Sequence, residues 1–590
     1  MERLFRYGSY TALALGLASG AVFVVFAILN RFELVAWDTW RQMGWWTVEW
    51  SLPSMMFRQY ETHRLPIVTL LMYLDQVYLN GRNLGVFIPV MSALVGTIAW
   101  CAHRLRAEVG DADVLRYTIA ALITLCLSLT SSDAIVHAFR AWVPLSLILA
   151  LLTMAAFARA VLSTPGRVRP TALALTAFLA VSCTYAGAPG LLIWPTLLLT
   201  GLVALGVTWR TMGCLMIVGA LALGFFFFNL DLLIAKHSAH SPLQHLNSIV
   251  GFLGYLTTFI GVPAGNALFF APFNVLAEES RIALGAVALL VFLVALAWAL
   301  IQPVRRPAVL TALGIAIFTF GWACSTVLKH NAPPPQPWSP VLKSQDFIAA
   351  RVFIAALITY LAMVMPTPAP RWLKGLFAVV ALGLTVALLP LQVQNGFAES
   401  QRKQEVIIGG LAFSAGVFED EHASHGAIHV ASEPGPIGPL SYPGKKLHQS
   451  YEPLPHIWAF MMGRRIAPLD HPGNRYIGAR FTDAFGDRPT DRCDGEFRGA
   501  RSVIDGARVW GRLQGVDNLD DVRIVILDPT HRIVGVGQSF NRFTYRMQFK
   551  VPEYPAQGGW FGYVNPDKTE GLSAVVVDRQ GQALCGFGAE

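Results

Sequence analysis

The sequence predicts a polytopic α-helical membrane protein with a C-terminal β-sandwich domain outside the cytoplasm. Of its 590 residues, 54% are hydrophobic and only 14% are charged, whereas a soluble chain carries about 25% charged residues. The charges are also uneven, because residues 391–590 hold 21 of the 45 basic and 23 of the 37 acidic residues. The first two thirds of the chain are therefore predicted to be membrane-embedded, and the last third water-soluble.

Eleven apolar runs are long enough to span about 30 Å of hydrocarbon. They are 9–30, 85–102, 117–131, 139–162, 170–185, 188–208, 213–229, 282–302, 307–327, 352–366 and 372–391. Two weaker runs, 65–80 and 248–275, are predicted to be interfacial or re-entrant, because the first is short and contains Asp75 and the second is broken by Gly and Pro. The alternative is that both cross the membrane as a compensating pair.

The basic residues predict the orientation. The first run follows Arg3 and Arg6, lacks a small-residue cleavage site and precedes further runs, which indicates an uncleaved helix with a cytoplasmic N-terminus. Alternate loops then hold basic residues, as the positive-inside rule requires. These residues are Arg104, Arg106, Arg116, Arg159, Arg167, Arg169, Arg210, Arg305, Arg306, Arg371 and Lys374. The protein is therefore expected to be a multipass membrane protein with a cytoplasmic N-terminus. Arginines on the cytoplasmic loops account for most of its net charge of +8, which therefore implies no nucleic-acid partner.

Three regions follow from this topology. Residues 1–391 form the transmembrane domain with an extracytoplasmic first loop at 31–64, residues 392–499 a loop-rich and helical connector, and residues 500–590 a periplasmic domain. Short alternating strands separated by turns in the last region are typical of an antiparallel β-sandwich.

The last region also offers a candidate carbohydrate-binding surface. Exported sandwiches often bind glycans through exposed aromatic rings, and Trp510, Trp560 and Tyr563 are the candidates here. The alternative is that these rings fill the core of the domain.

Two cysteines bracket the soluble domain. Cys493 and Cys585 are predicted to form a disulfide, because the domain is expected in an oxidising compartment. The alternative is two unlinked buried thiols. The other five cysteines lie in or beside apolar runs, where cysteine behaves as a small apolar residue.

The chain contains no phosphate-binding P-loop, no dinucleotide fingerprint and no zinc-spacing motif, which argues against nucleotide-driven pumping. The carboxylates are more informative. Four of the 14 acidic residues among the first 390 lie in the single loop 31–64, which is also rich in tryptophan. They are Glu33, Asp38, Glu49 and Glu61. A carboxylate at the membrane surface can act as a general base on a hydroxyl.

Cations predicted on the same side of the membrane could hold a phosphate. The candidates are Arg64, Arg140, Lys343 and Arg351, with His63 next to the first of them. Arginine offers bidentate phosphate contacts and lysine a point charge. For each cation, the alternative is a snorkelling or solvated side chain.

These features together resemble the glycosyltransferase C superfamily. Trp37-Asp38-Thr-Trp40 and Tyr60-Glu61-Thr-His63-Arg64-Leu-Pro-Ile are similar to a bacterial multipass group with a paired Asp-Asp-Trp and then Glu-His-Arg before an apolar helix. Tyr185-Ala-Gly-Ala-Pro-Gly-Leu-Leu-Ile-Trp-Pro195 and Tyr255-Leu-Thr-Thr-Phe-Ile-Gly261 also resemble parts of that group. This chain departs from the pattern, since Asp38 has no acidic neighbour and Thr62 separates Glu61 from His63.

The resemblance implies an enzyme that transfers a sugar from a polyprenyl-phosphate carrier to a hydroxyl of an extracytoplasmic glycan or glycoprotein, with inversion at the anomeric carbon. Asp38 is the first candidate for the base and Glu61 the second, although Asp38 could instead cap an interfacial helix. Arg64, with Arg351 or Lys343, would hold the departing lipid phosphate. Cations alone can hold a monophosphate, so no cofactor is required, and a divalent metal stays an open alternative.

Two other functions are compatible with the same features. A transporter or flippase for lipid-linked sugars would need paired halves and ionisable residues at mid-membrane, and the sequence has no internal repeat. The third interpretation is a non-catalytic component of an envelope-polysaccharide assembly, which would present its C-terminal domain to a glycan.

Overall fold

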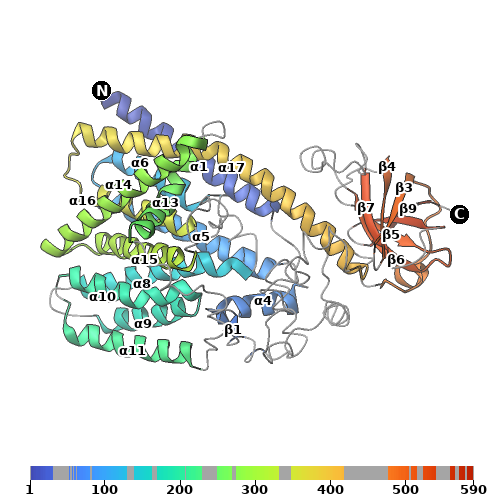
Figure 1. Cartoon of the computed structure of the whole chain (residues 1–590), viewed down its shortest axis with the longest axis horizontal. Helices are drawn as coiled ribbons and strands as arrows, with labels where there is room; N and C mark the ends of the chain where they lie inside the picture. Colours follow the sequence, from blue (N-terminus) through green and yellow to red (C-terminus); the bar gives the residue numbers. More distant parts are fainter. Residues whose placement is uncertain are drawn as a thin grey trace.

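The computed structural model consists of a helical bundle and a C-terminal sheet domain, which the long helix α17 joins (Figure 1). The structure describes residues 2–30, 52, 56, 59–60, 63–79, 83–128, 139–162, 169–205, 207–228, 249–268, 274–330, 347–417, 476–503, 506–514, 522–539, 559–564, 571–578 and 581–588.

The bundle contains helices at all eleven positions predicted from apolar runs. Those eleven helices are α1 (Glu2–Asn30), α5 (Leu84–Glu108), α6 (Ala112–Cys126), α8 (Trp142–Leu162), α9 (Pro170–Thr184), α10 (Ile193–Val203), α11 (Trp209–Phe227), α14 (Asn274–Ile301), α15 (Pro307–His330), α16 (Phe347–Val364) and α17 (Arg371–Ser414). The two weaker runs hold α4 (Pro66–Tyr78) and α13 (Ile249–Leu268). Within the described residues, eight helices are long and apolar enough to cross a membrane. The prediction of a mostly helical protein with several candidate membrane-spanning helices is therefore confirmed, whereas eleven crossings stay a prediction.

The two weaker runs also form helices. Helix α4 has 13 residues, which extend over about 20 Å, less than the thickness of the hydrocarbon. Helix α13 packs along α14 and also contacts α15, α16 and α17. The first run therefore has the length of an interfacial helix, and the second is covered by protein.

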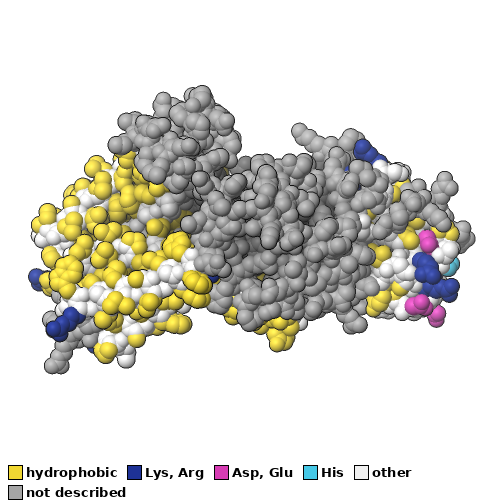
Figure 2. Space-filling model, turned by 60° about the horizontal axis from the view of Figure 1, so that its bottom comes forward, with side chains coloured by type: hydrophobic (Ala, Val, Ile, Leu, Met, Phe, Trp, Pro, Cys, Tyr) yellow, Lys and Arg dark blue, Asp and Glu magenta, His cyan; other side chains and the backbone are white. Residues whose placement is uncertain are grey.

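Basic residues gather at one end of the bundle. Lys374, at the start of α17, lies 2.6 Å from Asp111, and Arg116 of α6 lies 2.8 Å from Asp113. Burial raises the pKa of Asp111, but the hydrogen bond from Lys374 and those from backbone N–H groups outweigh it, so that the net pKa is lowered. Figure 2 shows lysine and arginine at this end, with hydrophobic side chains over the adjoining helices.

The α13/α14 pair depends on two glycines. A Cβ atom on Gly261 would overlap the backbone carbonyl of Arg281, and one on Gly285 would overlap that of Thr257. The two helices therefore approach each other as closely as their backbones allow, and only glycine fits at the crossing.

The C-terminal domain contains one seven-stranded antiparallel sheet in the order β3-β4-β7-β6-β5-β8-β9. Its strands are β3 (Asp494–Val503), β4 (Gly506–Gln514), β5 (Arg523–Leu527), β6 (Ile533–Ser539), β7 (Gly559–Val564), β8 (Ser573–Val577) and β9 (Ala583–Gly588). The sheet curls into half a barrel, and its end strands β3 and β9 contact each other. Among the described residues the strands form one curled sheet, so the predicted two-sheet sandwich is not confirmed. The alternation of residues predicts strands but not how strands divide into sheets.

The disulfide pair lies where the two end strands meet. Cys493 precedes β3 and Cys585 lies in β9; the two form a disulfide with a Cα–Cα distance of 5.3 Å. Beside it, Arg492 and Gly586 form a parallel bridge, and Cys493 N–H donates to the Gly586 carbonyl at 3.0 Å. The covalent link thus holds the edges of the curled sheet together.

Both faces of the sheet are covered. Trp560 is 1% exposed inside the curl, where its ring meets Phe497 and Phe587. Tyr563 is 0% exposed on the other face, in the same apolar cluster as Leu411, Ala412, Ala415 and Val417 at the end of α17. Burial on both faces explains why β7 and β8 are apolar without alternation.

This burial corrects the expected glycan platform. Trp560 and Tyr563 fill the core of the domain instead of lying on its surface, because the curl encloses one ring and α17 covers the other. Trp510 is half-buried and packs against the cluster that contains the end of α17.

The helix crossing gives a first prediction. Gly261→Ala should lower the free energy of unfolding of the detergent-solubilised protein by about 1–3 kcal/mol, because the added methyl must push α13 and α14 apart. Gly254, also in α13, has open space at its Cβ position and provides the control. Gly254→Ala should leave the stability unchanged or raise it by up to about 1 kcal/mol. Equal melting temperatures for the two variants would contradict the tight crossing.

Candidate functional site

The described cations of the predicted site lie at the end of the bundle opposite to the basic end. Asp38, Glu61 and Lys343 lie outside the described residues. The backbone of His63 belongs to β2 (His63–Arg64), which pairs with β1 (Gln59–Tyr60). The structure describes the side chains of three predicted cations at this end, Arg64, Arg140 and Arg351.

Arg64 lies where α9 and α11 end. It is 8% exposed and donates a hydrogen bond to the carbonyl of Phe228, the C-cap residue of α11. Its guanidinium also interacts electrostatically with the phenol of Tyr185. The C-terminal end of a helix carries partial negative charge, so this position suits a cation. Only one of the five guanidinium N–H groups is needed for the Phe228 carbonyl.

Tyr185, which follows α9, lies near Arg64. Its hydroxyl donates to the carbonyl of Ala222 at 3.1 Å, and its ring packs 5.9 Å from Phe226 and 6.2 Å from Phe225. The hydrogen bond ties the end of α9 to α11 and fixes the phenol beside Arg64. Arg64 thus lies at the end of α11, near a tyrosine that packs on two phenylalanine rings of that helix.

The turn after Tyr185 is shaped by close packing. A Cβ on Gly187 would lie 2.6 Å from the Trp142 ring, and one on Gly190 would overlap the carbonyl of Cys183. Trp142 in turn stacks on Trp322, with ring centroids 6.1 Å apart. The glycines of this sequence motif therefore have a packing role, which is to let the chain turn between α9 and α10.

Arg140 belongs to the short helix η2 (Phe139–Ala141), which packs against α4, α5 and α8. Its side chain is half-buried. Helix η2 contacts α4, and α4 begins two residues after Arg64. The same end of the bundle thus holds both cations.

Asp75 is the buried carboxylate of α4, and backbone N–H groups donate hydrogen bonds to it. Its oxygens accept N–H groups from Asn83 at 2.7 Å and Gly85 at 2.6 Å, which fixes the start of α5. Burial raises the pKa of Asp75, and these backbone hydrogen bonds act against that rise. Both oxygens are already hydrogen-bonded, so Asp75 has a structural role in joining α4 to α5.

Arg351 lies inside the bundle, in the second turn of α16, and is 2% exposed. It donates to the carbonyl of Ser128, just beyond α6, across 3.5 Å, and interacts electrostatically with Cys126. Burying a charge among apolar helices is costly unless polar or charged groups face it. An arginine in this position is therefore a candidate functional residue.

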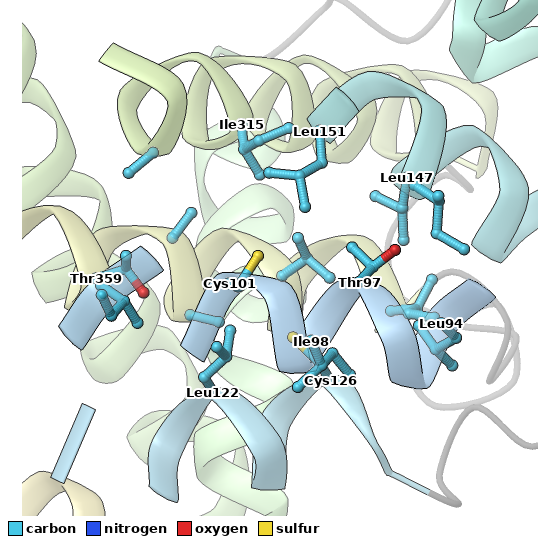
Figure 3. Close-up of a pocket in the computed structure, with 17 residues that line it drawn as sticks. Leu94, Thr97, Ile98, Cys101, Leu122, Cys126, Leu147, Leu151, Ile315 and Thr359 are labelled. Atoms are coloured by element: carbon cyan, nitrogen blue, oxygen red, sulfur yellow. The ribbon is translucent and has the colours of Figure 1, made fainter. Parts of the chain in front are cut away.

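An apolar cavity of about 110 Å³ lies between α5, α6, α8, α15 and α16 (Figure 3). Leu94 and Leu105 line it along α5, and Ile348 and Thr359 line it along α16. The two residues of each pair are eleven positions apart, so the lining extends for about 16 Å along the helix axis. Figure 3 shows the labelled side chains of α5, α6, α8, α15 and α16 around this space. Its lining residues are Leu94, Thr97, Ile98, Cys101, Leu105, Leu122, Cys126, Leu147, Ile148, Leu151, Ala312, Ile315, Ile348, Val352, Ala355, Ala356 and Thr359.

The cavity and the cation form one amphiphilic arrangement. Arg351 lies in the same helix as Ile348, Val352 and Ala355, and its charge is close to Cys126; all four of these neighbours line the cavity. Arg351 itself does not line the cavity: it lies in the chain between Ile348 and Val352, and its guanidinium binds the carbonyl of Ser128.

The cavity had no signal in the sequence. Its lining is ordinary apolar sequence from five helices, and only the packing brings these side chains around one space. The structure thus assigns Arg64 and Arg351 to two separate contact groups, one with α9 and α11 and the other with α6 and the cavity.

Among the described residues, no group of three or more His, Cys, Asp or Glu side chains is arranged to hold a metal ion. No protein-family model, curated protein or solved structure shows a significant match to this chain. Its function is therefore inferred from its own residues.

Proposed function

We propose that this protein is a membrane glycosyltransferase that moves a sugar from a polyprenyl-phosphate carrier to a hydroxyl group of an acceptor outside the cytoplasm. The observation that carries the proposal is the apolar cavity along α16, the helix that also holds the buried Arg351. A long hydrocarbon chain joined to a phosphate has the chemistry that this arrangement fits.

The carrier would bind by its two parts. Its hydrocarbon chain would occupy the space between α5 and α16, where nearly all lining side chains are apolar and each buried CH₂ group gains about 0.8 kcal/mol. Its phosphate would accept hydrogen bonds from Arg351, and charge-assisted bonds of this kind are the strongest that a side chain makes. Arg64, Arg140 and Lys343 are further candidates for contact with the phosphate or the sugar.

The reaction needs one base and a stabilised leaving group. The acceptor oxygen would attack the anomeric carbon while the bond from that carbon to the phosphate oxygen breaks, which inverts the configuration. Asp38 would take the hydroxyl proton, with Glu61 as the second candidate. The lipid monophosphate would leave as an anion and be stabilised by the arginines. Arginines can stabilise the charge of this leaving group without a metal ion, and a divalent ion stays an alternative.

The proposed orientation follows from the basic end. A cytoplasmic position for Arg106, Arg116 and Lys374 and eleven crossings of a bacterial inner membrane put residues 31–64, the start of α16 and the sheet domain in the periplasm. Asp38 follows the end of α1 by eight residues, so it belongs to the same side as Arg351. The sheet domain would hold the glycan or glycoprotein acceptor near the membrane surface.

The cavity also fits a second function, because a transporter or flippase for lipid-linked sugars would need to hold the same carrier. A non-catalytic role in polysaccharide assembly is the third. Purified protein in vesicles separates these functions. The enzyme releases polyprenyl phosphate from a sugar-loaded carrier in the presence of acceptor, the transporter moves the intact carrier across the bilayer, and the assembly component does neither.

The assignment of the base gives a testable prediction. Asp38→Asn should lower the release of polyprenyl phosphate by about 100-fold or more, because a positioned general base contributes that much, and Glu61→Gln should lower it if Glu61 assists. Release would be measured with a panel of polyprenyl-phosphate sugars and cell-envelope acceptors. Glu49→Gln, in the same loop, is the control and should keep activity. Full activity of both Asp38→Asn and Glu61→Gln would show that the base is elsewhere.

The phosphate contact gives another prediction. Arg351→Gln should weaken the binding of polyprenyl phosphate by about 10- to 100-fold, the value of a lost charge-assisted contact. Arg351→Lys should weaken binding less. Binding would be measured by native mass spectrometry, with melting temperatures to exclude unfolding. Arg210→Gln, an exposed arginine at the start of α11, is the control. Unchanged carrier affinity in Arg351→Gln would remove Arg351 from the site.

The hydrocarbon chain is tested by filling the cavity. Thr97→Phe, which adds a ring to the lining of the cavity, should weaken binding of the carrier by about tenfold or more. Val95, two residues away in α5, is 37% exposed, so Val95→Phe should bind as the wild type does. A matched loss in both variants would show that α5 had been disturbed in general. Wild-type binding in both would show that the chain lies elsewhere.

A further inference from the structure

A second pocket lies at the opposite, basic end of the bundle and is unrelated to the predicted site. It has a volume of about 450 Å³ and is formed by the end of α14, the link to α15 and the last turns of α16. Its lining residues are Trp298, Ile301, Gln302, Pro303, Val304, Arg305, Arg306, Val309, Tyr360 and Val364.

The two arginines of this pocket differ in their surroundings. Arg306 donates to the carbonyl of Met363 and lies 3.7 Å from Glu108, so the protein holds it in place. Arg305 is exposed and makes no hydrogen bond or ion pair within the part of the chain that the structure describes. The pocket therefore presents one fixed cation and one that is available for an anion.

The link that carries the arginines is fixed by backbone pairing. Val304 N–H donates to the carbonyl of Val203 at 2.8 Å, and Leu205 N–H donates to the carbonyl of Val304 at 3.2 Å. The link thus lies against the end of α10, and the pocket keeps its shape without a ligand.

The apolar surface beside the pocket is exposed. Trp298 is 54% exposed and Ile301 is 75% exposed, both at the end of the apolar window of α14. Further along α14, Leu290 and Val294 are 63% and 60% exposed. Exposed apolar side chains on a membrane helix face lipid chains, and tryptophan at its end marks the level of the headgroups.

We propose that this pocket binds the headgroup of an anionic phospholipid from the cytoplasmic leaflet. Arg305 and Arg306 would contact its phosphate, Gln302 and Trp298 would offer hydrogen-bond donors, and its acyl chains would lie along the exposed face of α14. A basic pocket between membrane helices on the cytoplasmic side has the chemistry that anionic headgroups require. The proposal uses the orientation given by the basic residues but does not depend on sugar transfer.

Lipid binding to the full-length, delipidated protein in detergent tests this. Native mass spectrometry would compare dioleoylphosphatidylglycerol with dioleoylphosphatidylcholine, and the melting temperature would be recorded with each lipid and with inorganic phosphate. We expect the wild type to prefer phosphatidylglycerol and Arg305→Gln to reduce that affinity by about fivefold, the effect of one basic side chain at a membrane surface.

Arg210→Gln is the matched control, because Arg210 is exposed at the same end of the bundle but does not line the pocket. It should keep the wild-type preference. Equal affinities for the two lipids, or equal losses in Arg305→Gln and Arg210→Gln, would overturn the proposal. Stabilisation by inorganic phosphate equal to that by phosphatidylglycerol would show a site for free phosphate instead of a lipid.

Discussion

The contact of α17 with α1 and α6 is the interaction on which the rest of the bundle depends. Gln392 is fully buried and donates to the carbonyl of Leu127 at 2.6 Å and to the Ser19 hydroxyl at 2.9 Å, while Asn30 donates to the carbonyl of Gly396 at 2.8 Å. Such bonds are retained inside apolar surroundings because unsatisfied polar groups there are costly. These hydrogen bonds fix the end of α6 at Leu127. The carbonyl of the next residue, Ser128, accepts the hydrogen bond from Arg351.

The same end of α6 connects this scaffold to the cavity. Cys126, in the last turn, lines the apolar space and is close to Arg351. Three consecutive residues, Cys126, Leu127 and Ser128, thus meet the cavity, α17 and α16 in turn. The position of the buried charge is therefore set by the helix packing and not by a mobile loop, which is how a rigid scaffold holds a binding group in place.

The sequence predicts those parts of the structure that depend on local composition. Apolar runs predict helices at all eleven positions because each run carries its own signal, and basic residues predict which helix ends meet. A sandwich was predicted where the strands form a half-barrel, because the sequence pattern of a strand does not indicate which strands it pairs with. Trp560 and Tyr563 were candidates for a surface, since nothing local indicates that α17 returns to cover β7. The cavity and the Ser128 contact of Arg351 depend on packing between distant helices, which no single segment predicts.

The sheet domain rests directly on a membrane helix. Helix α17 continues without a break from the basic end of the bundle to Ser414, and Leu411, Ala412 and Ala415 are buried in the cluster that includes Phe561 and Tyr563 of β7. From Phe397, where its apolar window ends, the helix extends for about 26 Å. A tilt of about 10° in the bilayer would displace the sheet by about 4–5 Å over that length. Because α17 is one continuous helix, a change in its tilt would move the sheet domain, and a force on the sheet domain would act on the helix that holds Gln392.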